Sequence, residues 1–265
     1  MPIHSTAIVD STAELGDVNI GPYAVVGPGV TLHDGVDVGP HSILFGETEV
    51  GANCRIHAHA VIGGDPQDLK YQGEPSRLVI GERNTFREFV TVSRGTLQGG
   101  GVTTIGNDNL FMACAHVGHD SQIGSHCVFA NSVALGGHVL IEDHAVLGGM
   151  AGVHQHARIG QFAMLGAGSI ASQDVPPFAI AQGDRARLFG LNIIGLRRGG
   201  FENETILKIR NAYRELFSKG VPIRIAIERV KKEIEGSGEV QKLLAFIENS
   251  QRGICRASGP DTTKQ

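Results

Sequence analysis

Residues 105–129 read IGNDNLFMACAHVGHDSQIGSHCVF, and every sixth residue of this stretch, counted from the first, is large and apolar. The same step of six continues without a break to Leu165, and it also occupies residues 20–62 and, more briefly, 80–92. A period of six fits neither an α-helix, with 3.6 residues per turn, nor a strand that alternates between two faces. The sequence therefore predicts a short structural unit that is repeated many times.

Each unit has a similar composition around its large apolar residue. A small residue often stands two positions earlier and a glycine often follows, as at Ala145, Leu147 and Gly148. We expect the large and small residues to point inward and the glycine to supply the turn conformation. Three units then close one triangular coil of 18 residues, and coils stack at the separation of about 4.8 Å between paired strands. The predicted fold class is mainly β, a parallel β-helix.

Two segments interrupt the period, at residues 63–79 and 93–104. Both are polar and contain glycine, so we predict two loops that leave the prism. Loops on a rigid scaffold are frequent sites of ligand contact. The repeat ends near residues 174–178, where Pro176 and Pro177 cannot donate hydrogen bonds to a neighbouring strand.

From Glu202 onward the apolar spacing becomes helical. The expected stripe comprises Ile206, Ile209, Ala212, Tyr213, Leu216 and Phe217. Gly220 is the expected end of this helix, and two more helices are predicted around residues 223–234 and 240–247. We therefore divide the chain into a β-helix with two loop insertions, residues 1–190, and a helical domain, residues 191–265, that covers the open sheet edge.

The bulk composition narrows the class of protein. A formal net charge of -4 gives no reason to expect binding to nucleic acid. The four cysteines form no CxxC pair, which suits free thiols in a reducing compartment. No apolar stretch approaches the roughly 20 residues of a membrane span, and no basic and then apolar signal opens the chain. We expect a cytoplasmic protein that spans no membrane.

The basic residues are unevenly distributed along the chain. Of its 23 Lys and Arg residues, 16 lie from Arg185 onward, whereas the acidic residues are spread more evenly. This asymmetry is typical either of a solvated helical surface or of a docking site for an anionic partner.

Histidines gather at one corner of the predicted coil. The spacing places His116, His119 and Asp120 on the outside of the prism. One coil later, at a distance of 18 residues, Gly137 follows His119 and His138 follows Asp120. The whole outward patch comprises His116, His119, Asp120, His138, His154 and Gln155.

Three functions are compatible with this patch. A zinc site needs three convergent ligands, for which His116, His119 and His138 are the candidates; zinc carbonic anhydrases with a trimeric β-helix provide a precedent. A general base needs one histidine that titrates near neutral pH and a neighbour that orients it. A β-helix scaffold or binding module needs neither. We favour the general base over the zinc site and the scaffold, because the two predicted loops contain segments for which neither of these alternatives has a use.

The loops and corners contain segments that resemble one enzyme family. They are QDLKYQGEP (67–75), VSRGTLQGGG (92–101), DNLFMACAHVGHD (108–120), GGHV (136–139), GVHQ (152–155), QDVPPFAIAQGD (173–184) and FGLNIIGLRR (189–198). From residue 6 to 254 the chain resembles the UDP-N-acetylglucosamine O-acyltransferases of lipid A biosynthesis, which are homotrimers with a left-handed β-helix and active sites between neighbouring prisms. The related N-acyltransferase is the alternative, but it has a uridine-binding domain before its β-helix, whereas here the hexads begin almost at once.

The resemblance implies a mechanism and a role for each matching residue. His119 is the general base that removes the proton from the sugar 3-hydroxyl, Asp120 supports it, and the Gly137 amide donates to the oxyanion formed at the thioester carbonyl. Attack is direct, with no covalent acyl-enzyme, no metal and no cofactor. The implied binding residues for sugar, nucleotide and donor are Asp68, Lys70, His116, His138, His154, Gln155, Asn192 and Arg198.

The implied acyl donor is a 3-hydroxyacyl chain on acyl carrier protein, an acidic partner that suits the basic C-terminal third. Ala167, with Met164 nearby, lies where the family forms the floor of its acyl groove, and a small alanine should admit a long chain. Ile194 and Gly199 depart from the family pattern, which has an acidic residue and often an arginine at these positions. The acceptor is N-acetylglucosamine or a 3-amino analogue of it.

Overall fold

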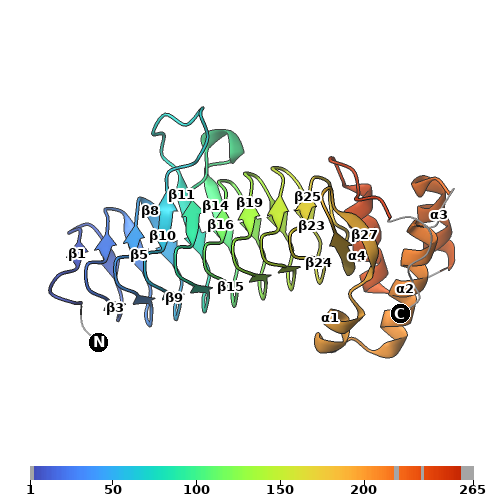
Figure 1. The fold of residues 1–265 in the computed structure, drawn as a ribbon, viewed down its shortest axis with the longest axis horizontal. Coiled ribbons are helices and arrows are strands. Elements are labelled where there is room, and N and C mark those ends of the chain that lie inside the picture. Colours follow the sequence, from blue (N-terminus) through green and yellow to red (C-terminus); the bar gives the residue numbers. More distant parts are fainter. Residues whose placement is uncertain (1–2, 218–220, 234–235, 258–265) are drawn as a thin grey trace.

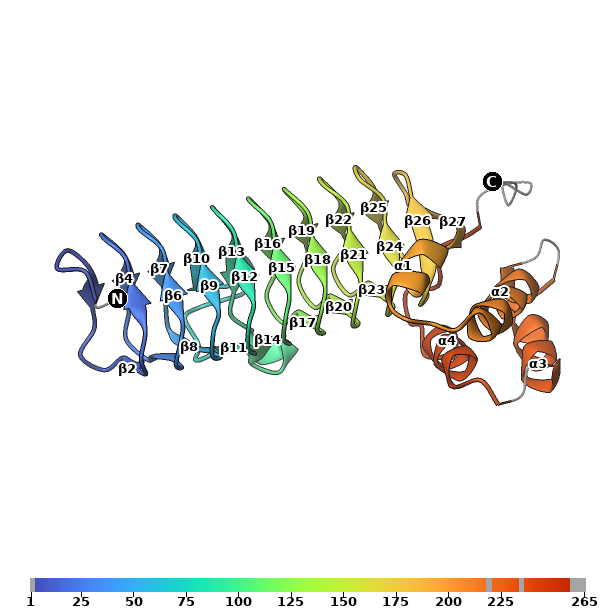
Figure 2. The ribbon, with the colours of Figure 1, turned by 90° about the horizontal axis from the view of Figure 1, so that it is seen from below.

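The computed structural model describes residues 3–217, 221–233 and 236–257. It shows a long prism that starts at the N-terminus and carries helices at its other end (Figure 1). Seen from below, the coils follow one another at regular intervals along the prism (Figure 2). The predicted mainly-β class with a small helical part is therefore confirmed.

The strands of the described residues form three sheets, one on each side of the prism, here named faces A, B and C. Face A contains β1 (Ile8–Val9), β4 (Val25–Val26), β7 (Ile43–Leu44), β10 (Val61–Gly64), β13 (Thr91–Ser93), β16 (His116–Val117), β19 (Ala134–Leu135), β22 (Gly152–Val153) and β25 (Ile170–Ala171). Face B contains β2 (Glu14–Leu15), β5 (Val30–Leu32), β8 (Glu47–Val50), β11 (Arg77–Ile80), β14 (Val102–Ile105), β17 (Gln122–Ile123), β20 (Leu140–Ile141) and β23 (Arg158–Ile159). Face C contains β3 (Asn19–Ile20), β6 (Asp37–Val38), β9 (Arg55–Ile56), β12 (Thr85–Phe86), β15 (Leu110–Phe111), β18 (Val128–Phe129), β21 (Val146–Leu147), β24 (Met164–Leu165), β26 (Ala179–Gln182) and β27 (Arg187–Leu191).

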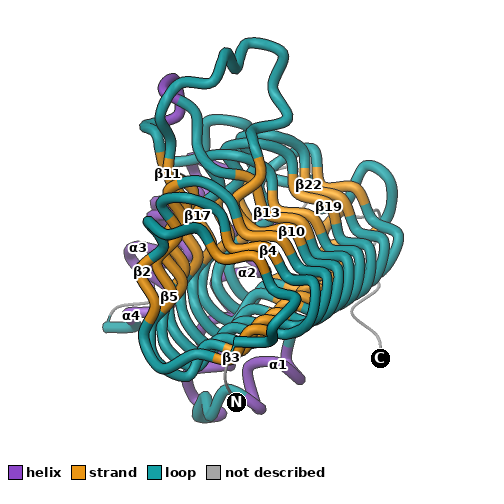
Figure 3. The backbone as a smooth tube through the Cα atoms, turned by 90° about the vertical axis from the view of Figure 1, so that its left-hand side faces the viewer, coloured by secondary structure: helices purple, strands orange, loops and turns teal. Residues whose placement is uncertain are grey.

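The chain visits the faces in the order A, B, C, and each strand up to β26 pairs in parallel with the strand one coil away. Ile123 pairs with Ile141, for example, at the predicted offset of 18 residues. Viewed from the N-terminal end, the chain turns counter-clockwise as it recedes, so the β-helix is left-handed (Figure 3).

The residues at the six-residue spacing point into the prism, as predicted. All of them are buried, with relative exposures of 4% or less, and the small residues two positions earlier are buried too. On face C the rings of Phe86, Phe111 and Phe129 lie above one another, with centroids 4.9 and 4.5 Å apart. Since equivalent positions stack in every coil, one repeated pattern builds one continuous core.

The role predicted for the glycines is wrong. The left-handed backbone conformation falls two residues after the glycine position and is held by non-glycine residues such as His41 (φ 58°), Asp120 (φ 59°) and His138 (φ 59°). The glycines are required by the neighbouring coil instead. A Cβ on Gly39 would lie 2.9 Å from the backbone nitrogen of Ala58, which is closer than real Cβ atoms approach other atoms.

Both insertions leave the prism at the same corner, between faces A and B, in two successive coils. The first joins β10 to β11 and the second joins β13 to β14, and they project on one side (Figure 1). The strands occupy the ends of both predicted segments, because β10 reaches Gly64, β11 begins at Arg77 and β14 begins at Val102. The second insertion also contains a short 3-10 helix, η1 (Leu97–Gly99).

The prism continues past the end of the regular repeat to β27, near the predicted domain boundary at residue 190. Strand β26 pairs in parallel with β24, and β27 then closes this edge by antiparallel pairing with β26. The chain tail returns to the prism, where Asp174 pairs with Ile254 and accepts a hydrogen bond from Ser250 Oγ at 2.7 Å. The helical segment thus begins and ends on the last coils.

Four α-helices occupy the described part of the C-terminal segment: α1 (Ile193–Arg198), α2 (Asn203–Phe217), α3 (Ile223–Glu233) and α4 (Gly238–Glu248). The sequence predicted the last three, whereas the short helix α1 was missed. Most of the expected stripe of α2 faces a second core with α3 and α4, whereas Tyr213 packs against the core of the prism. Gly220 and Ile234, the expected ends of two helices, lie outside the described residues. Within the described residues, no helix is both long and apolar enough to cross a bilayer.

Candidate active site

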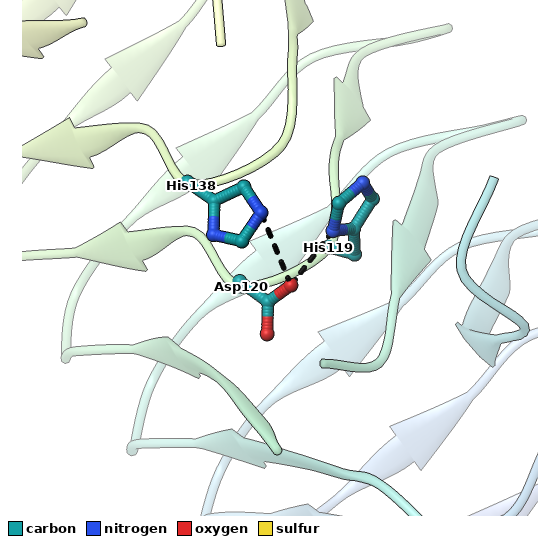
Figure 4. Close-up of side chains that lie close together, drawn as sticks. All are labelled: His119, Asp120 and His138. Atoms are coloured by element: carbon teal, nitrogen blue, oxygen red, sulfur yellow. Dashed lines mark hydrogen bonds and ion pairs between the residues drawn. The ribbon is translucent and has the colours of Figure 1, made fainter. Parts of the chain in front are cut away.

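The predicted histidine patch lies at the corner between faces A and B, where both insertions also leave the prism. His119 and Asp120 follow β16, and His138 follows β19 one coil later (Figure 4). The coil of His119 comes directly after the two coils that carry the insertions. The two insertions therefore border the histidines, although up to about fifty residues separate the first insertion from His119 in the sequence.

His119 and Asp120 form a hydrogen-bonded pair. The imidazole Nδ1 lies 2.7 Å from Asp120 Oδ2, whereas His138 Nε2 lies 3.7 Å from the same oxygen (Figure 4). A buried carboxylate beside Nδ1 favours the tautomer in which Nδ1 carries the proton. Nε2 of His119 then carries a free lone pair, which can accept a proton from a substrate.

Asp120 points outward, as predicted, but its side chain is fully buried. The second insertion covers it: the backbone N–H of Thr96 donates to Oδ1 and the Thr96 hydroxyl donates to Oδ2, each at 2.7 Å. The Asp120 N–H in turn donates to Thr103 Oγ1 at 2.8 Å. Sequence reasoning missed both threonines: Thr96 lies in an irregular loop with no period from which a contact can be read, and Thr103 lies in β14, inside the segment predicted as a loop.

Gly137 lies directly against the imidazole of His119. A Cβ built on Gly137 would be 2.5 Å from His119 Cε1 and 2.6 Å from Nε2. Gly137 is buried, and its backbone N–H meets no hydrogen-bond acceptor within the described chain. Since buried backbone donors are normally paired, this N–H is a donor available to a ligand beside the histidine.

His116 and His138 flank the pair as neutral side chains. Burial, and next the charge of His119, lower the pKa of His116, whose Nδ1 lies 2.7 Å from Thr91 Oγ1. Burial also lowers the pKa of His138, although the Asp120 carboxylate opposes this effect. Both side chains therefore remain uncharged at neutral pH and can act as hydrogen-bond partners without repelling a protonated His119.

The remaining predicted polar residues occupy two regions. Asp68 and Lys70 lie in the first insertion, and the charge of Asp68 reaches His138, where it slightly favours the protonated form. His154 and Gln155 are exposed at the same corner, one coil beyond His138. The first insertion is attached to the second by Arg94, a buried residue that sequence reasoning also missed.

Arg94 contacts three groups of the first insertion. Its guanidinium donates to the Gly63 carbonyl, to Asp65 Oδ1 at 2.5 Å and to the Tyr71 hydroxyl at 3.2 Å. Arg94 is only 9% exposed. Because Arg94 belongs to the second insertion, the two loops form one connected unit above the histidines.

Four predicted residues are not brought to His119 within this chain. Met164 lies in β24 and Ala167 in the following corner, between faces C and A, where it is exposed. Arg198 is the last residue of α1, and Asn192 directly precedes this helix, at the far end of the prism. Asn192 caps that helix: its Oδ1 accepts from Gly195 N and its Nδ2 donates to the Phe162 carbonyl, each at 3.0 Å.

The structure also explains one departure from the family pattern. Gly199 ends α1, and a Cβ at this position would lie 2.5 Å from Cε1 of Phe162. An arginine at position 199 therefore conflicts with the packing of Phe162 in this chain. Ile194, the other departure, is 65% exposed on α1.

The predicted zinc ligand set is changed by the structure. Among the described residues, the group that could hold a metal ion is His119, Asp120 and His138, with ligand atoms all within 4.8 Å of one another. His116 is not part of it. In the structure Asp120 Oδ2 is already hydrogen-bonded to His119 Nδ1 and to the Thr96 hydroxyl.

Comparison with known proteins identifies the class and then the family. Residues 103–137 match the bacterial transferase hexapeptide model of six repeats, so the fold and its corner site define a hexapeptide-repeat transferase. Residues 174–255 match domain 2 of UDP N-acetylglucosamine O-acyltransferase. The acyl-(acyl-carrier-protein)–UDP-N-acetylglucosamine O-acyltransferase of Thermodesulfovibrio yellowstonii is 46% identical over 255 residues, 96% of this chain and 99% of that protein. The chain belongs to this O-acyltransferase family.

Other relatives agree with this result. The enzyme of the same name from Syntrophobacter fumaroxidans is 46% identical over 97% of this chain and 100% of its own length. LpxA from Acinetobacter baumannii is 42% identical and superposes with a TM-score of 0.93, covering 96% of this chain and 99% of that one. LpxA of Bacteroides fragilis, 38% identical, gives a TM-score of 0.93 over 96% and 99%. These matches favour the O-acyltransferase over the related N-acyltransferase.

Proposed function

We propose that this protein transfers a 3-hydroxyacyl chain from acyl carrier protein to the 3-hydroxyl of UDP-N-acetylglucosamine, the first step of lipid A biosynthesis. Family membership supports the substrates. The single structural observation that supports the chemistry is the His119–Asp120 pair with the unpaired Gly137 N–H beside it.

The reaction begins with proton transfer to His119. The Nε2 lone pair accepts the proton of the sugar 3-hydroxyl while the hydroxyl oxygen forms a bond to the thioester carbonyl carbon. The negative charge that develops on the carbonyl oxygen is stabilised by the Gly137 N–H, a preorganised donor of the kind worth about 3 kcal/mol. The carbon–sulfur bond then breaks, and the protonated His119 returns a proton to the departing thiolate.

Asp120 supports both proton transfers. Its buried carboxylate accepts the hydrogen bond of His119 Nδ1, with Oδ2 and Nδ1 2.7 Å apart. This bond orients the imidazole ring and stabilises the imidazolium that forms during the reaction. Neutral His116 and His138 are suited to hydrogen-bond the sugar and diphosphate, together with Asp68 and Lys70 from the first insertion. The exposed side chains of His154 and Gln155 are suited to contact the nucleotide or donor.

The distant predicted residues reach the site in a homotrimer. With active sites between neighbouring prisms, as expected for a homotrimer of this family, Asn192, Arg198, Met164 and Ala167 of one subunit would face His119 of another. Asn192 would contribute mainly by orienting α1, because its amide groups are used within the chain. The basic C-terminal third then meets the acidic acyl carrier protein, and the reaction takes place in the cytoplasm.

The test is an acyl-transfer assay with purified protein, UDP-N-acetylglucosamine and 3-hydroxyacyl carrier proteins of several chain lengths. We expect transfer that peaks at one length and falls by about 10²–10⁴-fold in His119→Ala. A fully active His119→Ala variant would contradict the assignment of the base. Transfer only to a 3-amino sugar analogue would keep the acyltransferase but change its acceptor, because a neutral amine is already a nucleophile.

A zinc-dependent hydrolyase is the second candidate, and the observation that favours it is the compact cluster of His119, Asp120 and His138. It predicts stoichiometric zinc by elemental analysis and loss of activity after treatment with a chelator. Acyl transfer that persists at full rate after metal removal would exclude it.

A further inference from the structure

The second insertion places a polar residue directly on the catalytic carboxylate. Thr96 is 1% exposed and Asp120 is 5% exposed, and no part of the Asp120 side chain reaches solvent. The carboxylate accepts three hydrogen bonds in the described structure: two from Thr96 and one from His119 Nδ1, all at 2.7 Å. Thr96 thus supplies two of the three hydrogen bonds that this buried carboxylate accepts.

The arrangement of these bonds fixes the rotation of the carboxylate. The Thr96 N–H holds Oδ1, and the Thr96 hydroxyl shares Oδ2 with the imidazole. The direction of the hydroxyl is also defined, because Thr96 Oγ1 accepts the Gly99 N–H at 3.2 Å and therefore donates its own proton to Asp120. Rotation of the Asp120 side chain would break bonds at both oxygens.

Gly99 shows how closely the loop covers this group. A Cβ on Gly99 would lie 2.0 Å from Cγ of Asp120, so the loop backbone passes directly over the carboxylate and leaves no room for water on that side. Without the Thr96 hydroxyl, Oδ2 would lose a donor that water cannot replace. Buried charged oxygens that lose a donor reorient or destabilise their surroundings.

We propose that Thr96 is a positioning residue of the acyltransferase, which acts through Asp120 to hold the His119 imidazole in its reactive orientation. This inference rests on the proposed function. The second insertion is then part of the catalytic apparatus, and its role differs from that of the first insertion, which carries the polar groups that meet the substrate. Thr96 itself touches neither the sugar nor the thioester.

The test compares Thr96→Val and Thr96→Ser in the acyl-transfer assay. Valine preserves the shape of threonine but lacks the hydroxyl, whereas serine keeps the hydroxyl and loses a methyl group. Loss of a hydrogen bond to a charged group corresponds to about 10–100-fold in rate. We expect kcat to fall by this factor in Thr96→Val, with KM for UDP-N-acetylglucosamine within about twofold of wild type. Thr96→Ser should retain most of the rate.

A role in packing alone predicts the opposite order, with valine better tolerated than serine, and that result would overturn the inference. Thr48→Val is the matched control, because Thr48 is 1% exposed and its hydroxyl donates to the Phe45 carbonyl in a coil nearer the N-terminus. We expect its kcat to stay within twofold of wild type. If Thr96→Val does not fold, as judged by circular dichroism and size-exclusion chromatography, Thr96→Ala removes the same hydroxyl.

A double-mutant cycle with Asp120→Ala separates this role from a general effect of the loop. Once Asp120 is absent, Thr96→Val should change kcat by less than about threefold, because residues that act through one another are not additive. An equal loss in both backgrounds would show that Thr96 acts independently of Asp120 and refute the proposal. Absence of acyl transfer by the wild-type protein would instead refute the proposed function. The wild-type protein is assayed first, so this failure is distinguished from a failure of the Thr96 proposal.

Discussion

The substitution Gly137→Ala is expected to impair His119, the proposed catalytic base, while leaving the fold intact. The new Cβ would lie 2.5 Å from His119 Cε1, whereas ordinary contacts begin near 3.4 Å. The imidazole would therefore have to retreat by about 1 Å, and a misplacement of this size costs about 10²-fold in rate. The backbone N–H survives in alanine, so the proposed donor to the oxyanion remains and the loss of rate reports on the position of the His119 imidazole.

The backbone of Gly137 does not require glycine. Its φ lies outside the left-handed region, unlike that of its neighbour His138. The atoms met by the new methyl group belong to a side chain rather than to a strand of the next coil. We therefore expect the melting temperature to change by only a few degrees, while kcat in the acyl-transfer assay falls by about 10²-fold.

Gly39→Ala is the contrasting variant. Its Cβ would meet backbone atoms of the next coil at 2.9 Å, so a strand must shift and stability must fall. We expect a lower melting temperature and an unchanged kcat per folded molecule. Gly137→Ala with kcat within twofold of wild type would show that His119 tolerates displacement and would refute this reasoning.

Three further predictions concern the loops, the flanking histidines and the acyl groove. Arg94→Ala releases the first insertion and should raise KM for UDP-N-acetylglucosamine by about tenfold, whereas Arg87→Ala, which removes a half-exposed pair with the adjacent residue, should not. Burial lowers the pKa of His116 below its ordinary 6.5, so the folded protein binds a proton less readily than the unfolded chain, and the free energy of unfolding should fall as pH drops below 6.5. His116→Gln should weaken this pH dependence in thermal melts between pH 7.5 and 5.5, and an unchanged slope would contradict the prediction. Ala167→Met should shift the preferred donor to a shorter 3-hydroxyacyl chain in the carrier-protein panel, and an unchanged optimum would exclude Ala167 from the groove.

The contacts along the prism could be predicted because they occur at a constant distance in sequence. Because each coil consists of three units of six residues, the residue 18 positions later in the sequence lies directly above each corner residue. This rule correctly placed Gly137 beside His119 and His138 beside Asp120. The same offset of 18 residues separates His126 from His144, whose rings are stacked with centroids 4.8 Å apart.

The same rule could not reveal which residue holds a left-handed turn. The periodic glycines suggested that they do, because glycine tolerates that conformation best. In the structure, crowding between successive coils decides where glycine stands, and polar residues such as Asp120 adopt the positive φ. Local conformational preference alone was therefore an incomplete guide to a glycine in a stacked structure.

By itself the sequence determined the prism, the inward and outward direction of its side chains and the corner at which the histidines meet. In a solenoid, tertiary neighbours are a fixed function of sequence distance, so a local pattern is also a spatial one. Only the tertiary structure decided that Thr96 covers Asp120, that Arg94 joins the two insertions and that the chain tail returns to Asp174. These contacts involve loops and termini without a period, and their partners are selected by packing in three dimensions.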